Sequence, residues 1–517
     1  MLVMVSLFHL FMFAPSAYNQ DAIIDLNQRD RYGRTQLHNA VYEGDKEKIE
    51  LLLSNGADIN ATTIAGLTPL HLAKIAGYKD IVEWLISKGA DGTIQPPDES
   101  TQVDALLIPT NNSPGAAVIV IHHGKILHKK GYGLANLELD VPNTSQTKFR
   151  IGSITKIFTS TAILQLHDKG VLNIDDTIKI YMADLQNGDK ITIRQLLNHT
   201  SGLLESGGLE FNPGERLNYS NHGYMLLGKI IEKSTGMSYE NYLKENIFLP
   251  LNMINSGLDY SKEITKNRAS GYSVNPDGNF ANADYMDAAK AYSAGGLYST
   301  VEDLYLYDGA LYSDVLVKSQ TLQQAFSPAK LNDGSETGYG LGWMIGQYRG
   351  LKEVGHGGDI NGFNSYIARY PEQHFTVVVL SNISMSQRDN IPTAGDIAHR
   401  IAEIYLYDKM SPKQIQSRFK IDAKVYNDYV GQYKVNAEEE IIKSRGAFII
   451  ITIEKEHLFA QDNISKEEIF PESEDLFYIK SSPIKVKFIR NEQGEVVKLI
   501  AGMMGLREFQ ADKIRGN

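Results

Sequence analysis

The sequence predicts a multidomain protein with an N-terminal α-helical repeat module, a central α+β domain with an antiparallel sheet, and a small C-terminal all-β domain. Three observations predict this order. A repeat opens the chain, strand-like segments flank a long helical region in the middle, and short alternating strands fill the final part. The length of 517 residues also exceeds one ordinary hydrophobic core and favours two or three.

The repeat is a close internal similarity near the N-terminus. The segment "YGRTQLHNAVYEGDKEKIELLLSNGADIN" aligns with "AGLTPLHLAKIAGYKDIVEWLISKGADGT", pairing Gly33 with Gly66 and His38 with His71. This period and the string "TPLHLA" resemble ankyrin repeats, in which a turn precedes two antiparallel helices. We expect two repeats over residues 28–95, with the histidines bonding within each turn. Because a continuous core normally needs ~3 repeats, the module is expected to lean on the next domain.

The central domain is expected over residues 105–408, after a polar linker with paired prolines at 96–104. Its first segment, "AAVIVIHHGKILHKKGYG", alternates around a His-Gly turn as a β-hairpin does. A helix is expected over residues 153–168, and "FTVVVLSN", residues 375–382, is strand-like and is followed by helical "DIAHRIAEIY". Strands at both ends and helices between them predict an α+β domain with an antiparallel sheet.

The C-terminal part, residues 411–517, has a different pattern. The segments "AFIIITIE" and "IKVKFIRNEQGEVVKLI" are rich in β-branched residues, and the second alternates around an Asn-Glu-Gln-Gly turn. The pattern predicts a small all-β domain, and no nucleophile of its own stands out in it.

Composition excludes several classes of function. The formal net charge of -11 and a pI near 5.7 offer no general attraction for phosphate backbones, so nucleic acid is not an expected partner. The chain has no cysteine, which excludes disulfides, cysteine-ligated zinc and thiol nucleophiles. We expect no metal site and no cofactor.

The N-terminal residues are almost entirely apolar. "MLVMVSLFHLFMFAPSA" ends in small residues and resembles a secretory signal, although the usual positive start is missing. Residues 1–20 are therefore a candidate signal peptide, which would export the protein to the periplasm or cell envelope. A misplaced start codon or a short membrane anchor is the alternative, and the protein would be cytoplasmic if residues 1–17 are not a functional signal.

Ser153 and Lys156 lie three positions apart in "FRIGSITKIF". A hydroxyl is a poor nucleophile until a base takes its proton, and lysine can be that base only when neutral. Burial and the positive end of a helix both lower the pKa of a lysine. A helix that begins at Ser153 would place the amine within reach of the hydroxyl on one face. A capping serine followed by a surface lysine has the same spacing, so the pair alone does not identify a site.

Five further segments follow the pair in order: "LLNHTSGL" (196–203), "FNPGERLNYSNHGYMLLGKIIEKSTGMSYENYLKENIFLPLNM" (211–253), "SAGGLYSTVEDL" (293–304), "YGLGW" (339–343) and "GHGGDINGF" (355–363). Together they resemble the serine β-lactamase-like hydrolases, the family of class C β-lactamases, D-aminopeptidases, family VIII esterases and low-molecular-weight penicillin-binding proteins. The resemblance covers all three active-site motifs of that family.

The resemblance implies a role for each matching residue. Ser153 would be the nucleophile and Lys156 its proton acceptor. Tyr219 falls on the Tyr-x-Asn motif and would relay protons, while Asn221 would bind the acyl side-chain amide and help to hold Lys156. The backbone N–H groups of Ser153 and Asp359 would form the oxyanion hole.

The third motif departs from that of the β-lactamases. His356, Gly357 and Gly358 stand where those enzymes carry Lys-Thr-Gly. The glycines would leave room for a substrate along the strand. Histidine is mostly neutral at neutral pH, so the permanent charge that lysine offers to a substrate carboxylate is missing. Esterase or peptidase activity is therefore expected rather than strong β-lactamase activity, with a merely structural His356 as the alternative. His199 is expected to shape a turn near the site.

The expected reaction is two-step acyl transfer without a cofactor. The substrate would be a small ester, a D-amino-acid peptide or a peptidoglycan fragment. Two alternatives stay open: a penicillin-binding-like protein that is acylated slowly, and a scaffold with little turnover whose ankyrin repeats bind a protein partner.

Overall fold

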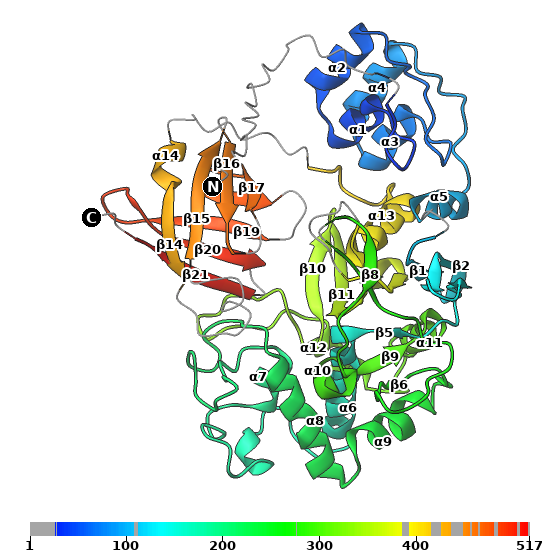
Figure 1. Ribbon diagram of the computed structural model, residues 1–517. Coiled ribbons are helices and arrows are strands. Elements are labelled where there is room, and N and C mark those ends of the chain that lie inside the picture. Colours follow the sequence, from blue (N-terminus) through cyan, green and yellow to red (C-terminus); the bar gives the residue numbers. More distant parts are fainter. Residues whose placement is uncertain are drawn as a thin grey trace, which may run out of the picture.

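Two antiparallel helical pairs form the N-terminal module of the computed structural model (Figure 1). The structure describes residues 26, 28–107, 112–275, 277–384, 392–414, 425–435, 448–454, 457–463, 466–479, 484–503 and 507–514. The candidate signal peptide, residues 1–20, lies outside this part of the chain. The helices of the module are α1 (Gln36–Glu43), α2 (Lys46–Ser54), α3 (Pro69–Ala76) and α4 (Lys79–Ser87).

A threonine and a histidine begin the first helix of each repeat. The Thr35 hydroxyl accepts the backbone N–H of His38, and His38 Nδ1 accepts the Thr35 N–H at 3.1 Å, which is a reciprocal cap. Nε2 of the same ring lies 3.1 Å from the Leu67 carbonyl in the next repeat. Thr68 and His71 repeat the arrangement. Both histidines therefore use their ring nitrogens inside the module, as the sequence predicts.

The repeat module docks on the central domain through a buried polar network. Arg349 donates to the carbonyls of Ile75 and Ala76, each at 2.9 Å, at the end of α3. It also binds Glu403 of helix α13 (Ala394–Leu406) at 3.1 Å, and the Tyr42 hydroxyl at the end of α1 donates to the same carboxylate at 2.5 Å. The first helices of the two repeats thus face the central domain, which supplies the support that two repeats lack.

The central domain is built on an antiparallel sheet in the strand order β10-β11-β12-β13-β1-β2. The strands are β1 (Ala116–His122), β2 (Lys125–Tyr132), β10 (Met344–Tyr348), β11 (Leu351–Ile360), β12 (Phe363–Tyr370) and β13 (Phe375–Ser381). The first and last segments of the domain meet because β1 pairs with β13, with Ala116 opposite Ser381. This pairing explains why the sequence has strands at both ends of the domain.

Helices cover both faces of this sheet. Val118 and Val120 of β1 pack with α13, whereas Ile119 and Ile121 belong to the core beneath helix α6 (Thr155–Asp168). Strands buried on both faces read as continuous apolar runs, which is why "AAVIVI" shows little alternation. On the α6 side lie α7 (Ile193–Leu197), α8 (Asn221–Thr235), α9 (Tyr239–Leu243), α10 (Tyr292–Gly295), α11 (Val301–Ala310) and α12 (Ser319–Ala325), while α5 (Glu99–Leu106) lies against α13.

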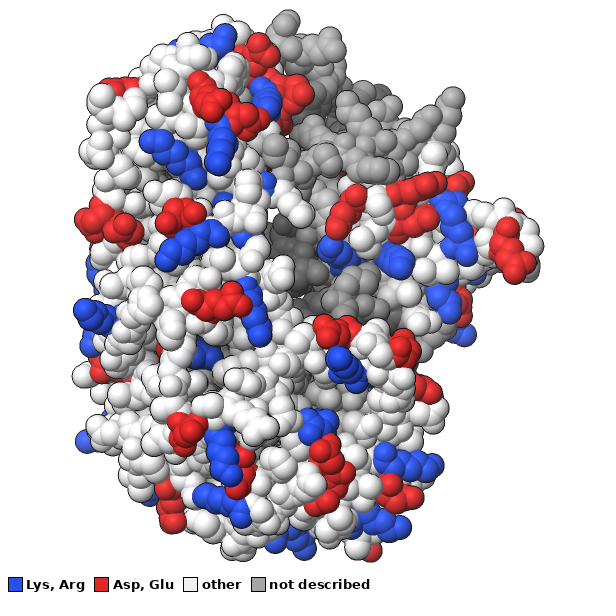
Figure 2. Space-filling model, turned by 180° about the vertical axis from the view of Figure 1, so that it is seen from behind, with Lys and Arg blue, Asp and Glu red and all other residues white. Residues whose placement is uncertain are grey.

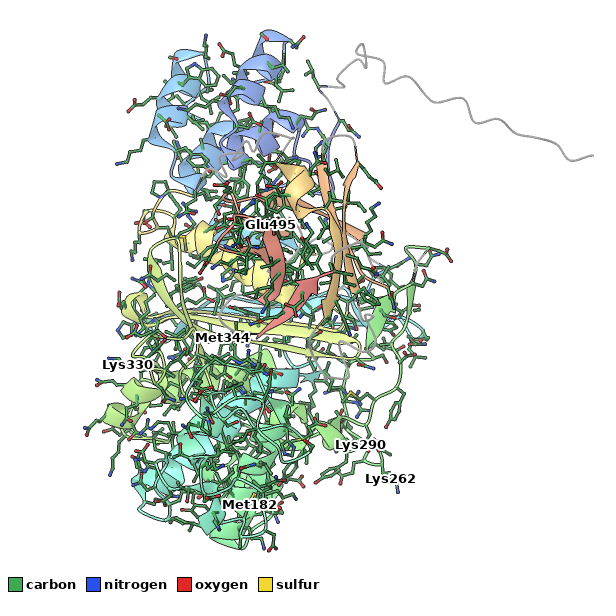
Figure 3. The ribbon with its side chains drawn as sticks, turned by 90° about the vertical axis from the view of Figure 1, so that its left-hand side faces the viewer. Met182, Lys262, Lys290, Lys330, Met344 and Glu495 are labelled. Atoms are coloured by element: carbon green, nitrogen blue, oxygen red, sulfur yellow. The ribbon has the colours of Figure 1, made fainter. Side chains whose placement is uncertain are left out.

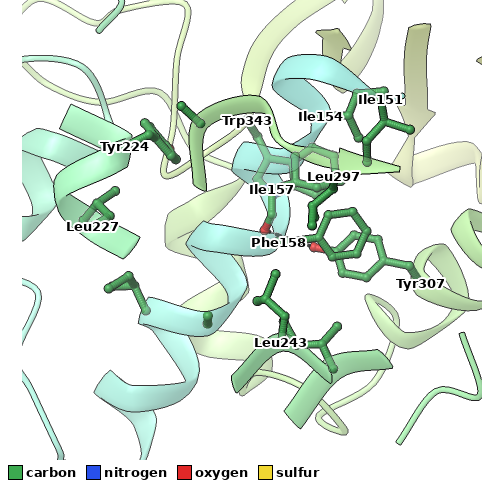
Figure 4. Packing of buried hydrophobic residues seen from close by; sticks show 14 of the residues in the cluster. Ile151, Ile154, Ile157, Phe158, Tyr224, Leu227, Leu243, Leu297, Tyr307 and Trp343 are labelled. Carbon is green, nitrogen blue, oxygen red and sulfur yellow. Dashed lines mark hydrogen bonds between the residues drawn. The ribbon is translucent and has the colours of Figure 1, made fainter. Parts of the chain in front are cut away.

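Short elements complete the domain. They are β3 (Leu134–Asn136), β4 (Val141–Pro142), β5 (Phe149–Arg150), β6 (Gly257–Leu258), β7 (Tyr272–Val274), β8 (Phe280–Asn282), β9 (Leu297–Ser299), the 3₁₀ turns η1 (Gly152–Ile154), η2 (Ile178–Ile180), η4 (Ala288–Ala291) and η5 (Pro371–Gln373), and the π-helical turn η3 (Lys244–Phe248). Figure 4 shows Ile157 and Phe158 of α6 packed among Leu297, Tyr307 and Trp343, so α6 is the central helix of the larger core.

The C-terminal part is a closed antiparallel barrel, which confirms the predicted all-β domain. After α14 (Tyr426–Tyr429) its strands are β14 (Gly431–Val435), β15 (Phe448–Glu454), β16 (His457–Gln461), β17 (Lys466–Pro471), β18 (Leu476–Ile479), β19 (Lys485–Arg490), β20 (Val496–Met503) and β21 (Arg507–Lys513). The barrel closes where β14 pairs with β21. In Figure 3, Glu495 of the barrel and Met344 of β10 lie far from Met182 in the helical half of the central domain.

Charges of both signs are interspersed over the molecular face in Figure 2, without one large basic area on that side. This distribution agrees with the acidic composition. Within the described ranges, no helix combines the length and the apolar character that crossing a bilayer requires.

The buried pair of Arg349 and Glu403 predicts a measurable cost of undocking the repeats. Their side chains are 6% and 2% exposed, so Glu403→Gln leaves a buried guanidinium without its counter-charge. We expect the free energy of unfolding in urea to fall by about 3 kcal/mol. The exposed pair of Lys46 and Asp80 is the control, because Asp80→Asn should cost less than about 1 kcal/mol. Equal losses in the two variants would contradict a stabilising interface.

Candidate active site

Ser153 lies in the 3₁₀ turn η1, directly before α6, and its side chain is half-buried. The preceding Gly152 has φ +50°, and a Cβ there would lie 2.8 Å from the backbone nitrogen of Asp359. Glycine therefore allows both the left-handed conformation and the close approach of this turn to β11. The turn brings together the two backbone segments to which the resemblance assigns the oxyanion hole.

Lys156 occupies the first turn of α6, and its side chain is fully buried. Its Nζ lies 3.0 Å from Ser153 Oγ, 2.8 Å from Asn221 Oδ1 and 2.7 Å from the Ala294 carbonyl. Burial lowers the pKa of this amine well below its usual value of 10.5, and desolvation is the cause. The lysine is therefore poised to be neutral.

The three contacts of Lys156 suit a neutral amine. Such an amine has two N–H donors and one lone pair. The Asn221 amide oxygen and the Ala294 carbonyl can only accept, so they take the two N–H groups. When the amine is neutral, its remaining lone pair faces the Ser153 hydroxyl at 3.0 Å, and the hydroxyl can then donate to it. In this state the amine is placed to act as a base on the hydroxyl.

Tyr219 and Asn221 enter the site at the start of α8. The side chain of Ser220 caps this helix by accepting the Gly223 N–H, which fixes the residues on either side of it. The Tyr219 ring centroid lies 4.7 Å from Lys156 Nζ, so the ring packs directly against the amine. The segment thus places a phenol and an amide oxygen around one amine.

His356 lies on β11, and its ring centroid is 6.3 Å from that of Tyr219. Its Nε2 is 2.8 Å from the Tyr339 hydroxyl and its Nδ1 is 2.6 Å from the Gly357 carbonyl. Burial, followed by the nearby Lys156, lowers the pKa of His356 to about 3, while the bond to Gly357 acts in the opposite direction. The imidazole is neutral at physiological pH.

The two glycines of the third motif have different surroundings. A Cβ on Gly358 would lie 1.9 Å from the Ile151 carbonyl, whereas one on Gly357 would meet the Tyr366 ring at an ordinary 3.5 Å. The β10–β11 ladder ends at Gly355, so the following residues of β11 form a strand edge beside η1. Exposed Asp359 follows on this edge. Gly358 is needed by the fold, and Gly357 leaves space on the strand.

His199 has a more specific position than the sequence indicated. It lies just after α7 with φ +60°, and its Nδ1 accepts the Ser220 N–H at 3.0 Å. Its ring is 4.2 Å from that of Tyr219 and 4.6 Å from that of Tyr339. His199 thus packs against the Tyr219 ring as part of a turn near the site.

Tyr339 is the residue that sequence reasoning missed. It stands in the segment "YGLGW", which was recognised only as part of the family resemblance. Its side chain is fully buried and links His356 to His199. From the sequence alone, a tyrosine among apolar residues is predicted to be a core residue. Only the place of Tyr339 in that segment could have indicated the site.

The predicted residues therefore surround one site. Lys156 contacts Ser153, Asn221 and the ring of Tyr219, and the His356 ring lies 6.3 Å from the same ring. In the part of the chain that the structure describes, no group of three or more histidine, aspartate or glutamate side chains is placed to hold a metal ion.

Comparisons with known proteins match both the central domain and the repeat module. The family model described as Beta-lactamase matches residues 94–400, and the model described as Ankyrin repeats (3 copies) matches residues 8–96. Penicillin-binding protein 4* of Bacillus subtilis (strain 168) is 29% identical over 418 residues, which are 72% of this chain and 90% of that protein.

Two solved structures share the fold. The octameric penicillin-binding protein homologue from Pyrococcus abyssi is 23% identical, with a TM-score of 0.53, and the match covers 84% of this chain and 99% of that one. The D-amino acid amidase from Ochrobactrum anthropi SV3, complexed with L-phenylalanine amide, is 24% identical, with a TM-score of 0.51, over 60% of this chain and 97% of that one.

The lowered pKa of Lys156 predicts a pH dependence of stability. Above the lowered value the folded state leaves the amine neutral, whereas the unfolded chain binds a proton up to about pH 10.4. Stability is therefore lost as the pH falls through this window, by about 1.4 kcal/mol per pH unit. We expect the difference in unfolding free energy between the wild type and Lys156→Met, which cannot ionise, to follow this slope from about pH 9.5 to 8.5 in urea titrations. A flat difference would show a charged Lys156.

The two glycines of β11 form a matched pair for a second prediction. Gly358→Ala should destabilise the fold by about 1–3 kcal/mol, because its Cβ overlaps the Ile151 carbonyl. Gly357→Ala should change stability by less than about 0.5 kcal/mol, because its Cβ would meet the Tyr366 ring at an ordinary contact distance. Thermal unfolding of the two variants measures the difference. A reversed ranking of the two stabilities would contradict the contact.

Proposed function

The chain belongs to the β-lactamase family, and on that premise we propose that it is a serine hydrolase that cleaves an ester or amide through an acyl-enzyme on Ser153. The contact of 3.0 Å between the fully buried Lys156 amine and the Ser153 hydroxyl carries the proposal. Relatives with this fold include a D-amino acid amidase and penicillin-binding proteins, which supports serine hydrolase chemistry at the level of the family.

In the acylation step, the lone pair of Lys156 takes the proton of Ser153 as Oγ attacks the carbonyl carbon. The backbone N–H groups of Ser153 and Asp359 would stabilise the oxyanion, with roughly 3 kcal/mol from each donor. Tyr219 lies against the amine and would pass the proton to the leaving alkoxide or amine. The C–O or C–N bond then breaks and leaves an ester on Ser153.

In the second step, water attacks this ester and the same groups act in reverse. Lys156 and Tyr219 accept a proton from the water as its oxygen bonds to the acyl carbon. The proton returns to Ser153 Oγ as the acyl–enzyme bond breaks, and a carboxylic acid is released. Asn221 contacts Lys156 and would also bind an amide of the acyl group.

The proposed substrates are small esters, D-amino-acid amides or peptides, and peptidoglycan fragments. The open strand edge from His356 to Asp359 could bind an extended acyl group through backbone hydrogen bonds. The likeness to a D-amino acid amidase makes D-amino-acid amides the first substrates to test. Peptidoglycan fragments as substrates would also need the protein to be exported.

The second candidate is a penicillin-binding protein that is acylated without rapid turnover. Penicillin-binding protein 4*, whose match covers 72% of this chain, supports this candidate by its name. Rapid deacylation distinguishes the hydrolase from it. In this second candidate, Ser153 would be acylated, but the acyl group would leave it slowly.

Active-site labelling tests both candidates. We expect a fluorophosphonate probe to label Ser153, and Ser153→Ala to lose labelling and to lower p-nitrophenyl ester turnover at least a thousandfold, roughly the scale of losing a nucleophile. Mass mapping identifies the labelled peptide, and Ser160→Ala is the control, since Ser160 is a buried serine of the same helix that bonds the Leu341 carbonyl. Stable labelling by fluorescent penicillin without ester turnover would favour the second candidate. Absence of labelling at Ser153 by both probes would reject both.

A further inference from the structure

His356 has no ring nitrogen available for a substrate. The Gly357 carbonyl can only accept, so Nδ1 must carry the hydrogen across their 2.6 Å contact. Because the ring is neutral, Nε2 then has a lone pair, and the Tyr339 hydroxyl lies 2.8 Å away to donate to it. The two contacts select one neutral tautomer and use both nitrogens.

The surroundings of His356 oppose any positive charge there. Lys156 from α6 and His199 after α7 are the basic groups that face it, and burial lowers the pKa of each. The phenols of Tyr219 and Tyr339 complete these surroundings. An imidazolium would also have to donate through Nε2, which would displace the Tyr339 hydrogen from its acceptor. The wall of the site at this strand is therefore uncharged.

We propose that Tyr339 is a positioning residue that holds His356 as the neutral Nδ1–H tautomer, and that the resulting uncharged wall makes the enzyme select acyl groups without a carboxylate. The second half of this inference rests on the proposed hydrolase function. A carboxylate brought against this wall would lose water without gaining a cation, which is costly. A neutral acyl chain meets no such penalty.

Nitrogen NMR of the histidines tests the tautomer without any turnover. In protein labelled with ¹⁵N-histidine, the signals of His356 are those that disappear in His356→Gln. We expect a protonated Nδ1 and an unprotonated Nε2, unchanged from about pH 8 to pH 5. A protonated Nε2, or titration of this ring above pH 5, would overturn the proposal.

Tyr339→Phe tests the positioning role, because it removes only the hydroxyl that donates to Nε2. We expect His356 to titrate at a higher pH in this variant, or to show a mixture of tautomers, with the fold confirmed by circular dichroism. Tyr307→Phe is the matched control, since that buried hydroxyl lies 2.7 Å from Thr161 Oγ1 instead. Unchanged His356 signals in Tyr339→Phe would overturn the role of Tyr339.

Two esters of similar length test the selectivity. We expect kcat/KM to be at least about tenfold higher for p-nitrophenyl butyrate than for mono-p-nitrophenyl succinate, and His356→Lys to shift this ratio at least about tenfold towards succinate. Equal or faster cleavage of the succinate ester by the wild type would overturn the selectivity. Loss of fluorophosphonate labelling at Ser153 would instead reject the hydrolase function, and the NMR result would still decide the tautomer.

Discussion

The desolvation of one amine is the constraint on which the rest of the site depends. Lys156 can accept a proton from Ser153 only if it is neutral, and burial lowers its pKa well below the usual value. This burial extends along the helix, since every residue of α6 from Thr155 to Leu166 is buried, the polar ones included. The amine still needs acceptors for its two N–H groups, which Asn221 and the Ala294 carbonyl supply from two other elements.

Local patterns in the sequence predict the helices and strands that depend mainly on interactions between residues close in the chain. The hairpin β1–β2, the helix after Ser153 and the strands of the barrel follow from the pattern of apolar residues and from turn residues. The spacing of Ser153 and Lys156 also fixes their contact, because both lie on one turn. Tyr219 and His356 come from distant elements, and only the order of family motifs placed them near the serine. The hydrogen bond between Tyr339 and His356 joins two different segments of the chain, so no local sequence pattern predicts it.

The docking of the repeats and the active site share one strand. Strand β11 runs from Leu351, next to the turn whose Arg349 binds the repeat module, to Ile360 beyond the third motif. The sequence predicted that two repeats need support, but it could not identify Glu403 and Arg349 as the partners, since they look like ordinary charged residues of a helix and a turn. A charged pair becomes a buried interface only when the repeats cover it. The repeats therefore cover the turn that precedes the strand on which His356 lies.

The histidine of the third motif leaves desolvation as the cause of the lowered pKa of Lys156. A lysine at position 356 would add a charge that lowers the pKa of Lys156 by repulsion. Neutral His356 adds no such charge, so desolvation must supply the whole effect. The tyrosines and histidines around the amine, Tyr219, Tyr224, Tyr339 and His199, exclude water without adding charge. Aromatic side chains that exclude water, and not a second cation, thus keep Lys156 neutral.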